Sequence, residues 1–507
     1  MDKNKVILIG IDGCTFRILW PLTRDGYLPS FLEIIENGCH TNLISTLPFN
    51  TLPAWTSIFT GVNPGKHGIT GEVIRENGQY KLASSRDRAV DSLWSILTRH
   101  HIKQVIVNEP VTFPPEKVHG IMITGFSTPP QSRDFVYPVS LRDEIEKISH
   151  GYETDLPLGF DQVIARSKSK GFQLITRFAK KIIKTAKYLY SNYDWQLFSV
   201  IITSTDRLQH FYFGDHQSIT SHYQLLDSFI NYVISHSDDA NIIVVSDHGF
   251  GSLRKCFYIN TWLKYQGVVS ERQNVINLVL SKLHITYIKI ASILLKLKLY
   301  KFLSKITPSS VKHSLPVSEY ASSVDFNRSE VVFPSINGGL FINSYGSRVM
   351  EAIKALISEF FIKKEVIEHV YLRKHIVWGP YAHRASDIYL LPKYGYEISP
   401  LITSRPIAEP SEYGDIRTGT HRPDGIFIAY GPDIRKGIKL KSPIFTWDIA
   451  PIILHMLNLP IPTYMDGKVR KDLFRKGSTL FVKSVKYSHV LSRRIVRSRL
   501  KLFKKSS

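Results

Sequence analysis

The chain has 507 residues, of which 43% are hydrophobic and 12% aromatic, and this is enough apolar material for a large core. Such a composition excludes an intrinsically disordered chain and a small disulfide scaffold. The formal net charge of +22 is concentrated in residues 162–190, 272–312 and 481–507, which contain no Asp or Glu. Because the rest of the chain is close to neutral, we expect no specific binding of nucleic acid.

Cysteine usage and hydropathy bear on the cellular location. The three cysteines, Cys14, Cys39 and Cys256, cannot all pair with one another, and the chain begins with charged residues followed by a strand-like run. We therefore expect a cytoplasmic protein. No stretch approaches the roughly 18 uninterrupted apolar residues that a membrane-spanning helix needs. The nearest, residues 288–299, contains three lysines, so we expect no span across a bilayer.

Apolar runs typical of strands buried on both faces recur along the chain. They are Lys5–Gly13, Gln104–Asn108, Ile121–Thr124, Phe198–Thr203, Asn241–Ser246 and Gly425–Tyr430. Helical patterns lie between them, for example at Leu28–Asn37, Leu93–His100 and Tyr223–Ser235. This alternation predicts an α/β fold with a mostly parallel sheet that is covered by helices on both faces.

Two regions depart from the alternation. Residues 155–190 predict a helix with one apolar and one basic face, and the Lys-rich, apolar start of residues 265–345 indicates an insertion or cap. We therefore expect a catalytic domain over residues 1–470, including the insertion, followed by a basic tail over residues 471–507.

The tail has the most regular helical pattern in the chain. From Leu491 onward, apolar residues fall on one half of a helical wheel and basic residues on the other, with Arg499 as the exception. Such a helix can lie on an anionic membrane surface. The alternatives are a helix docked on the catalytic domain and a disordered basic tail.

Acidic and histidine side chains follow several of the predicted strands. Parallel sheets collect polar chemistry beyond the carboxyl ends of their strands. A helical turn at Asp206 would also put His210, four residues later, on the same face. The candidates are Asp12, Asp206, His210, Asp247, His248 and, in a loop before the last strand, His421.

These residue types predict a metal site. Carboxylate and imidazole ligands without thiolates suit Zn²⁺ or Mn²⁺, and more than four of them indicate two ions. Two neighbouring divalent ions are the usual apparatus for displacement at phosphorus. Taken singly, each motif is also explained as an ordinary turn or a chance spacing.

A candidate nucleophile lies between the first and second strands. Thr51 precedes a helix that Pro53 opens, so we expect Thr51 to be the N-cap of that helix. The start of a helix favours negative charge, and a phosphoryl group would be stabilised there. The alternative is that Thr51 only caps the helix.

In this order, the motifs IGIDG, TLPAWTSIFTGVNPGKHGI, TDRLQHFYF, SDHGFG and GTHRPDGIF resemble the type I phosphodiesterase/nucleotide pyrophosphatase family of the alkaline phosphatase superfamily. The similarity runs from about residue 5 to residue 470 and ends in DIAP and YMDG. The resemblance implies an alkaline-phosphatase-like fold and a phosphoric ester hydrolase.

The resemblance also implies a role for each candidate residue. Asp12, Asp247 and His248 would hold one metal ion, which also polarises Thr51, and Asp206, His210 and His421 would hold the other. Thr51 would attack phosphorus and form a phosphothreonine that water then hydrolyses.

One departure from the family bears on the substrate. In nucleotide pyrophosphatases an Asn after the His-Gly-Ile turn helps to hold a phosphate oxygen, but here Thr70, Gly71 and Glu72 follow that turn. Lys66 and His67 are interpreted as turn and surface residues, and Trp55 as a core residue.

We expect a small-molecule or lipid-linked phosphodiester as substrate. The alternatives are a phosphomonoesterase or a phosphoglycerate-mutase-like phosphotransferase, which share the metal arrangement, and a catalytically silent protein that binds membrane surfaces. The complete set of seven residues argues against the silent protein.

Overall fold

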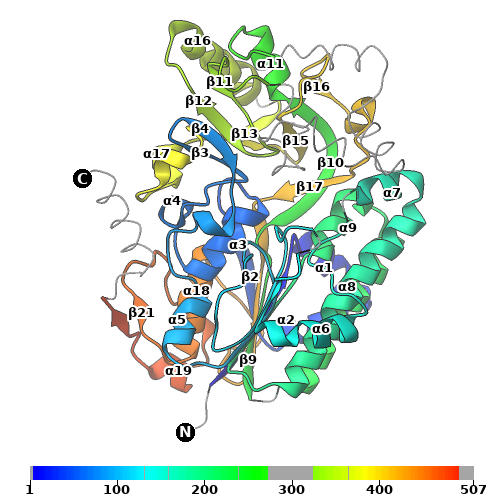
Figure 1. The fold of residues 1–507 in the computed structure, drawn as a ribbon, viewed down its shortest axis with the longest axis vertical. Coiled ribbons are helices and arrows are strands. Elements are labelled where there is room, and N and C mark those ends of the chain that lie inside the picture. Colours follow the sequence, from blue (N-terminus) through cyan, green and yellow to red (C-terminus); the bar gives the residue numbers. More distant parts are fainter. Residues whose placement is uncertain are drawn as a thin grey trace.

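The computed structural model describes residues 4–130, 132–157, 159–237, 239–271, 324–363 and 365–489. These residues form a lower lobe around a central sheet and a smaller upper lobe (Figure 1). The amphipathic tail helix predicted from Leu491 onward and most of the Lys-rich part of the predicted insertion lie outside the described residues. Among the helices of the described ranges, none has the length and apolar character needed to cross a membrane.

The central sheet has ten strands. Nine follow the order β19-β2-β18-β9-β1-β8-β5-β6-β7, and β20 pairs with β2. Their bounds are β1 (Lys5–Ile11), β2 (Cys39–Ile44), β5 (Gln104–Glu109), β6 (Gly120–Thr124), β7 (Val136–Tyr137), β8 (Leu197–Ile202), β9 (Ala240–Val245), β18 (Asp424–Tyr430), β19 (Ile438–Lys439) and β20 (Ile444–Phe445). β1, β5, β6, β8 and β9 pair in parallel, whereas β18 runs antiparallel to both β9 and β2. The predicted α/β fold with a mostly parallel sheet is confirmed.

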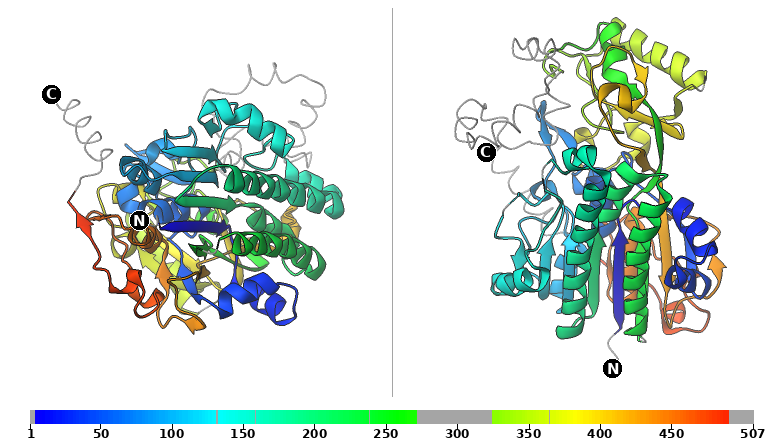
Figure 2. Two further views of the ribbon diagram at one scale, coloured as in Figure 1. Left: turned by 90° about the horizontal axis from the view of Figure 1, so that it is seen from below. Right: turned by 90° about the vertical axis from the view of Figure 1, so that its right-hand side faces the viewer.

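Helices cover both faces of this sheet (Figure 2). Side chains of β1 alternate between two cores, so that Ile7 and Ile9 belong to one and Val6 and Leu8 to the other. The first core lies against α1 (Phe16–Arg24), α2 (Pro29–Glu36), α8 (Lys168–Asn192) and α10 (His216–Ser235). The second lies against α3 (Thr51–Thr60), α5 (Leu93–Arg99) and α18 (Ile449–Met456). It also buries Leu473 and Leu480, which precede the undescribed end of the chain.

The single helix predicted over residues 155–190 is wrong in its boundaries. The segment forms two helices, α7 (Phe160–Arg166) and α8, which are separated at Ser167. Ser167 is extended and its hydroxyl accepts a hydrogen bond from the amide of Lys170 at 3.3 Å. One helix ends and the next begins here because the serine side chain accepts a hydrogen bond from a free amide in the first turn of the second helix.

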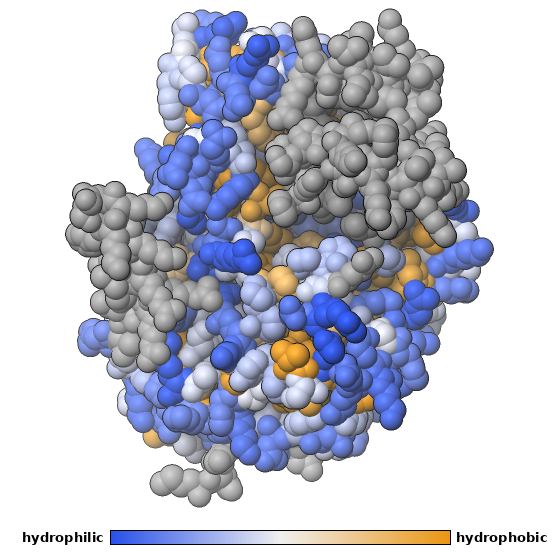
Figure 3. Space-filling view, in the orientation of Figure 1, coloured by the Kyte–Doolittle hydropathy of each residue, from blue (hydrophilic) through white to orange (hydrophobic). Residues whose placement is uncertain are grey.

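Strand β10 (Gly249–Tyr258) leads from the central sheet into the upper lobe and begins just after His248. Two sheets and a core of their own form this lobe. Its elements are α11 (Ile259–Tyr265), β11 (Val331–Val332), β12 (Gly339–Ile342), α16 (Ser347–Leu356), β13 (Ile367–Leu372), β14 (Ile388–Pro392), β15 (Gly395–Ser399), β16 (Ile407–Ala408) and β17 (Gly419–Arg422). The described part of the predicted insertion contributes β11 and β12. Figure 3 shows a largely hydrophilic face with apolar residues gathered between the lobes.

We predict that Asp227→Ala lowers the free energy of unfolding by about 1–3 kcal/mol. Helix α2 has no side-chain cap of its own, and the carboxylate of Asp227 in α10 accepts hydrogen bonds from the amides of Ser30 and Phe31 at 3.3 and 2.8 Å. Urea unfolding measures the loss. Asp227→Asn keeps one acceptor oxygen, so it should cost less. Equal stability of the alanine variant and the native protein would contradict the prediction.

Candidate active site

Asp206, His210 and His421 come together at the carboxyl edge of the central sheet. Asp206 and His210 lie one turn apart on α9 (Ser204–Tyr212), as predicted, because this helix starts directly after β8. The Oδ1 atom of Asp206 is 3.0 Å from Nε2 of His421 and 3.5 Å from Nε2 of His210, and the two Nε2 atoms are 3.0 Å apart. Oδ1 of Asp206 and the Nε2 atoms of His210 and His421 therefore face a common point.

The sequence interpretation placed His421 in a loop, and this is wrong. His421 lies on β17, opposite Phe250 of β10, because the antiparallel pairing with β10 extends through Gly419–Arg422. Its Nδ1 donates to the carbonyl of Phe49 at 3.2 Å, and Nδ1 of His210 donates to the carbonyl of Gly419 at 3.2 Å. With the protons on Nδ1, both Nε2 atoms are left with free lone pairs.

Asp12, Asp247 and His248 form the neighbouring set. Nε2 of His248 is 3.6 Å from Oδ1 of Asp12 and 3.4 Å from Oδ2 of Asp247. The other oxygen of each carboxylate accepts a hydrogen bond. Oδ2 of Asp12 accepts one from the indole of Trp55 at 3.1 Å, and Oδ1 of Asp247 accepts one from the amide of Gly13 at 3.3 Å. Position 13 requires glycine, because φ is +69° and a Cβ atom would lie 2.9 Å from Phe250.

The two sets adjoin, since ligand atoms of Asp12, Asp206 and His248 also lie within 4.8 Å of one another. Four converging buried atoms have no hydrogen-bond partner in the described part of the chain: Oδ1 of Asp12, Oδ1 of Asp206, Oδ2 of Asp247 and Nε2 of His248. Ligands about 2.0–2.1 Å from a tetrahedral ion lie about 3.3 Å apart, close to the spacings in both sets. The residues present therefore fit two divalent ions.

The electrostatics of the site are unfavourable without a cation. Burial, reinforced by Asp206, raises the pKa of Asp12 to about 8, and burial together with Asp12 raises the pKa of Asp247 well above its usual range. Burial alone would raise the pKa of Asp206, but His210 and His421 hold it well below the usual value. Burial, reinforced by His421, lowers the pKa of His248, which favours the neutral, ligating form.

Thr51 is the first residue of α3 and not its N-cap, because Asn50 occupies the cap position. The predicted cap was therefore wrong by one residue. The side chain of Asn50 does not cap the helix and donates instead to the carbonyl of Ile336 at 3.3 Å. Thr51 itself is 8% exposed. The segment before it is joined to His421 through Phe49, and the helix after it is joined to Asp12 through Trp55.

Three residues in α3 and in the short helix α4 (Pro64–His67) that follows it differ in part from their sequence interpretation. Trp55 is buried in the core as expected, but its indole also contacts Asp12. His67 was interpreted as a surface residue, yet it is fully buried, with Nε2 3.0 Å from the hydroxyl of Ser57, and burial lowers its pKa to about 3. Lys66 forms an ion pair with Asp466 at 2.6 Å.

Sequence reasoning missed two charged residues beside the Asp206 set. Arg207 donates to Oδ2 of Asp206 at 3.0 Å. Burial raises the pKa of Glu72 to about 7, with Arg207 opposing the shift and Asp206 reinforcing it. The position of Arg207 next to Asp206 in the sequence was a usable signal, whereas nothing local to Glu72 indicates its neighbours.

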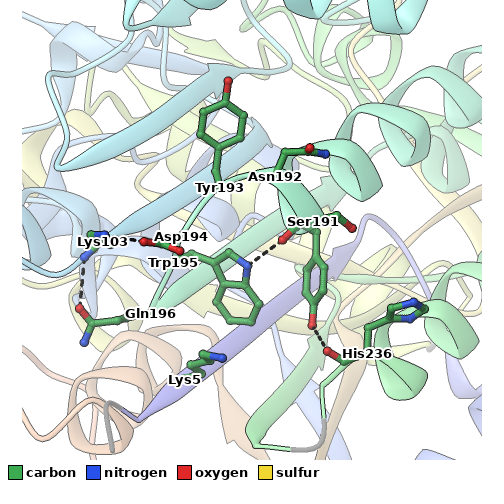
Figure 4. A pocket seen from close by; sticks show the side chains of 10 residues that line it. Lys5, Lys103, Ser191, Asn192, Tyr193, Asp194, Trp195, Gln196 and His236 are labelled. Carbon is green, nitrogen blue, oxygen red and sulfur yellow. Dashed lines mark hydrogen bonds and ion pairs between the residues drawn. The ribbon is translucent and has the colours of Figure 1, made fainter.

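A cavity of about 450 Å³ opens at the opposite edge of the sheet, where the strands begin. Lys5, Lys103 and Trp195 are among the residues that line it (Figure 4). Lys5 pairs with Asp239 at 2.9 Å and Lys103 with Asp194 at 2.7 Å, so both cations are neutralised. The cavity lies at the edge away from the carboxylate and imidazole sets and takes no part in the site.

A family model described as type I phosphodiesterase / nucleotide pyrophosphatase matches residues 6–402. No curated protein sequence matches the chain.

Solved structures that are similar to most of the chain include three of ectonucleotide pyrophosphatase / phosphodiesterase 5. Human ectonucleotide pyrophosphatase / phosphodiesterase 5 superposes with a TM-score of 0.53 at 14% identity, and its murine counterpart with a TM-score of 0.52 at 15% identity. The murine protein, as an inactive threonine-to-alanine variant in complex with AMP, gives a TM-score of 0.52 at 16% identity. Each comparison covers 93% of this chain and 100% of the other.

We predict that divalent metal binding at neutral pH releases protons. Asp12, with its pKa raised to about 8 in the metal-free protein, is mostly protonated at pH 7 and must lose its proton to act as a ligand. The apparent affinity should therefore fall by at least about tenfold for each pH unit below about 8, because Asp12 releases one proton and Asp247, whose pKa is also raised, adds to the release. Calorimetric Zn²⁺ titration in buffers of different ionisation enthalpy measures both effects. Equal affinity at pH 6 and pH 8 would contradict the prediction.

Proposed function

Because the chain belongs to the type I phosphodiesterase/nucleotide pyrophosphatase family of phosphoric ester hydrolases, we propose that it cleaves a phosphodiester through a phosphothreonine at Thr51. Its fold is alkaline-phosphatase-like. We further propose two divalent ions, zinc before manganese, one held by Asp12, Asp247 and His248 and the other by Asp206, His210 and His421.

The main support for this proposal is that hydrogen bonds connect the start of α3 to both ligand sets. Trp55, one turn after Thr51, donates to Asp12 at 3.1 Å, while Phe49, two residues before Thr51, accepts from His421 at 3.2 Å. These two contacts support a location of the Thr51 hydroxyl between the sets. The inactive threonine-to-alanine variant of the murine neighbour is in keeping with a threonine nucleophile.

The start of α3 can also stabilise negative charge. The first amides of a helix lack intrahelical acceptors, and Pro53 has no amide proton. The amides of Thr51 and Leu52 are therefore the ones available to a phosphoryl oxygen, since the amide of Ala54 donates to the carbonyl of Asn50 at 3.2 Å. This arrangement supports an anion at the same end of the helix as the nucleophile.

The proposed reaction has two displacements. The Oγ1 atom of Thr51 loses its proton and forms a bond to phosphorus, and the ester bond to the departing alcohol oxygen breaks. Water then displaces Oγ1 from the phosphothreonine and restores the hydroxyl. The two ions, when bound, would lower the pKa of the nucleophile and stabilise the charge on the departing oxygen. Trp55 and Gly13 hold the Asp12 and Asp247 carboxylates in place throughout.

A diester is the better fit to the charges around the site. A phosphomonoester carries about one more negative charge than a diester and needs additional cationic contacts. Arg207, the cation beside Asp206, is already engaged by the carboxylates of Asp206 and Asp155. Glu72, whose pKa is raised to about 7, adds negative charge to the same surroundings above that pH. A monoesterase and a mutase-like phosphotransferase are therefore disfavoured, and a small-molecule phosphodiester is the proposed substrate class.

We predict that Thr51→Ala lowers the hydrolysis of bis-(p-nitrophenyl) phosphate by on the order of 10³-fold or more, because no other hydroxyl is available to attack. The nearby hydroxyl of Thr56 bonds to the carbonyl of Leu52 at 2.7 Å within the helix. Thr56→Ala is thus the matched control and should keep most of the activity. Retention of the rate by Thr51→Ala would point to direct attack by water and contradict the proposal.

We predict that Glu72→Gln raises kcat/KM for p-nitrophenyl phosphate relative to bis-(p-nitrophenyl) phosphate by about three- to tenfold. Above the raised pKa of Glu72, where the assay must be run, removal of its negative charge favours the dianionic monoester more than the monoanionic diester. Glu76→Gln is the control, since Glu76 pairs with Lys81 and Arg384. An unchanged ratio would show that Glu72 does not govern the preference.

A further inference from the structure

Arg207 bridges the metal-ligand carboxylate of Asp206 and a second carboxylate, Asp155. One guanidinium nitrogen, Nη1, donates to Oδ2 of Asp206 at 3.0 Å. The other two, Nε and Nη2, donate to the two oxygens of Asp155 at 3.4 and 3.1 Å. Arg207 is therefore fixed by a two-point contact on one side, and presents a single donor to Asp206 on the other.

The surroundings of Arg207 restrict its movement further. Its guanidinium lies 4.8 Å from the ring centre of Phe126, which packs against the apolar cluster containing Leu52, the residue after Thr51. The side chain of Arg207 is 18% exposed and that of Asp206 is 2% exposed. A planar cation held by a carboxylate pair and an aromatic face has little freedom to leave Asp206.

The two oxygens of Asp206 consequently have separate tasks. Oδ2 is taken by Arg207, whereas Oδ1 has no hydrogen-bond partner in the described chain and faces Nε2 of both His421 and His210. A carboxylate free at both oxygens can bind an ion through either one or both. Arg207 leaves one oxygen for the ion, which keeps the ligand count of this set at three and a fourth position open.

We propose that Arg207, anchored by Asp155, is a positioning residue that makes Asp206 a one-oxygen metal ligand and so sets the affinity and open position of the metal site formed by Asp206, His210 and His421. This inference rests on the proposed function, since it assumes that these three residues bind a metal ion. Neighbouring groups that orient a metal ligand typically account for about 10–100-fold in affinity.

The experiment is a Zn²⁺ titration of the full chain against a competing chelator, with His421→Ala used to assign the weaker or stronger transition to this set. Arg207→Met should weaken that transition by about 10–100-fold and leave the other within about threefold. Arg207→Lys keeps the charge but cannot span both carboxylates, so it should fall between Arg207→Met and the native protein. Asp155→Asn should also weaken the Zn²⁺ transition assigned to this set. Circular dichroism checks that each variant is folded.

Arg99→Met is the matched control. Arg99 forms an ion pair with Asp91 at 3.0 Å on α5, away from the site, so both transitions should be unchanged. Steady-state kinetics add a second readout. For a positioning residue, excess Zn²⁺ should restore part of the lost kcat of Arg207→Lys while KM stays near the native value. A raised KM with unchanged Zn²⁺ affinity would make Arg207 a substrate contact and overturn the inference.

The failure of the inference is distinct from the failure of the proposed function. If the native protein binds two ions and all Arg207 and Asp155 variants bind them equally well, only the inference is overturned. Absence of any Zn²⁺ binding by active native protein would overturn the proposed function and the inference together.

Discussion

The central constraint on this protein is the burial of three carboxylates within a few Å of one another. Asp12, Asp206 and Asp247 are each at most 2% exposed and follow three adjacent strands, β1, β8 and β9, with Asp206 in the first turn of α9. Mutual repulsion and desolvation oppose their ionisation, and in the metal-free protein protons and imidazoles offset this only in part. Divalent cations would supply the positive charge that this cluster of carboxylates lacks. The neighbouring residues hold the carboxylates in the positions that such cations need.

The supporting contacts have a common pattern. In each carboxylate one oxygen accepts a hydrogen bond and the other faces the site. The donors are the Trp55 indole, the Gly13 amide and the Arg207 guanidinium. The upper lobe takes part through Asn337, which donates to the hydroxyl of Thr420 at 3.3 Å, next to His421. Helix α3, the central sheet and the upper lobe therefore meet at the candidate ligands, and a change in any of them should alter the site.

The sequence predicted what depends on local pattern. Buried strands and the i, i+4 pair of Asp206 and His210 follow from composition and spacing over a few residues, whereas the grouping of the candidate residues into two metal sites came from the resemblance to the family. What it missed depends on tertiary contacts: His421 is on a strand because β10 pairs with it, and His67 is buried because Ser57 of α3 packs over it. The break at Ser167 was readable in principle, since serine is a favoured cap, but the apolar pattern continued across it. The roles of Glu72 and Asp155 require the folded chain. The cytoplasmic location and the domain boundaries stay predictions.

The claim on which the account depends is that Thr51 becomes phosphorylated during turnover. The most direct measurement is acid quenching of the Zn²⁺-loaded enzyme during hydrolysis of bis-(p-nitrophenyl) phosphate, followed by peptide mass spectrometry. If Thr51 is the nucleophile, a substituted phosphoryl group is found on Thr51 in the native protein and none is found in Thr51→Ala. Full turnover without phosphorylation of Thr51, or phosphorylation of another residue, would contradict it.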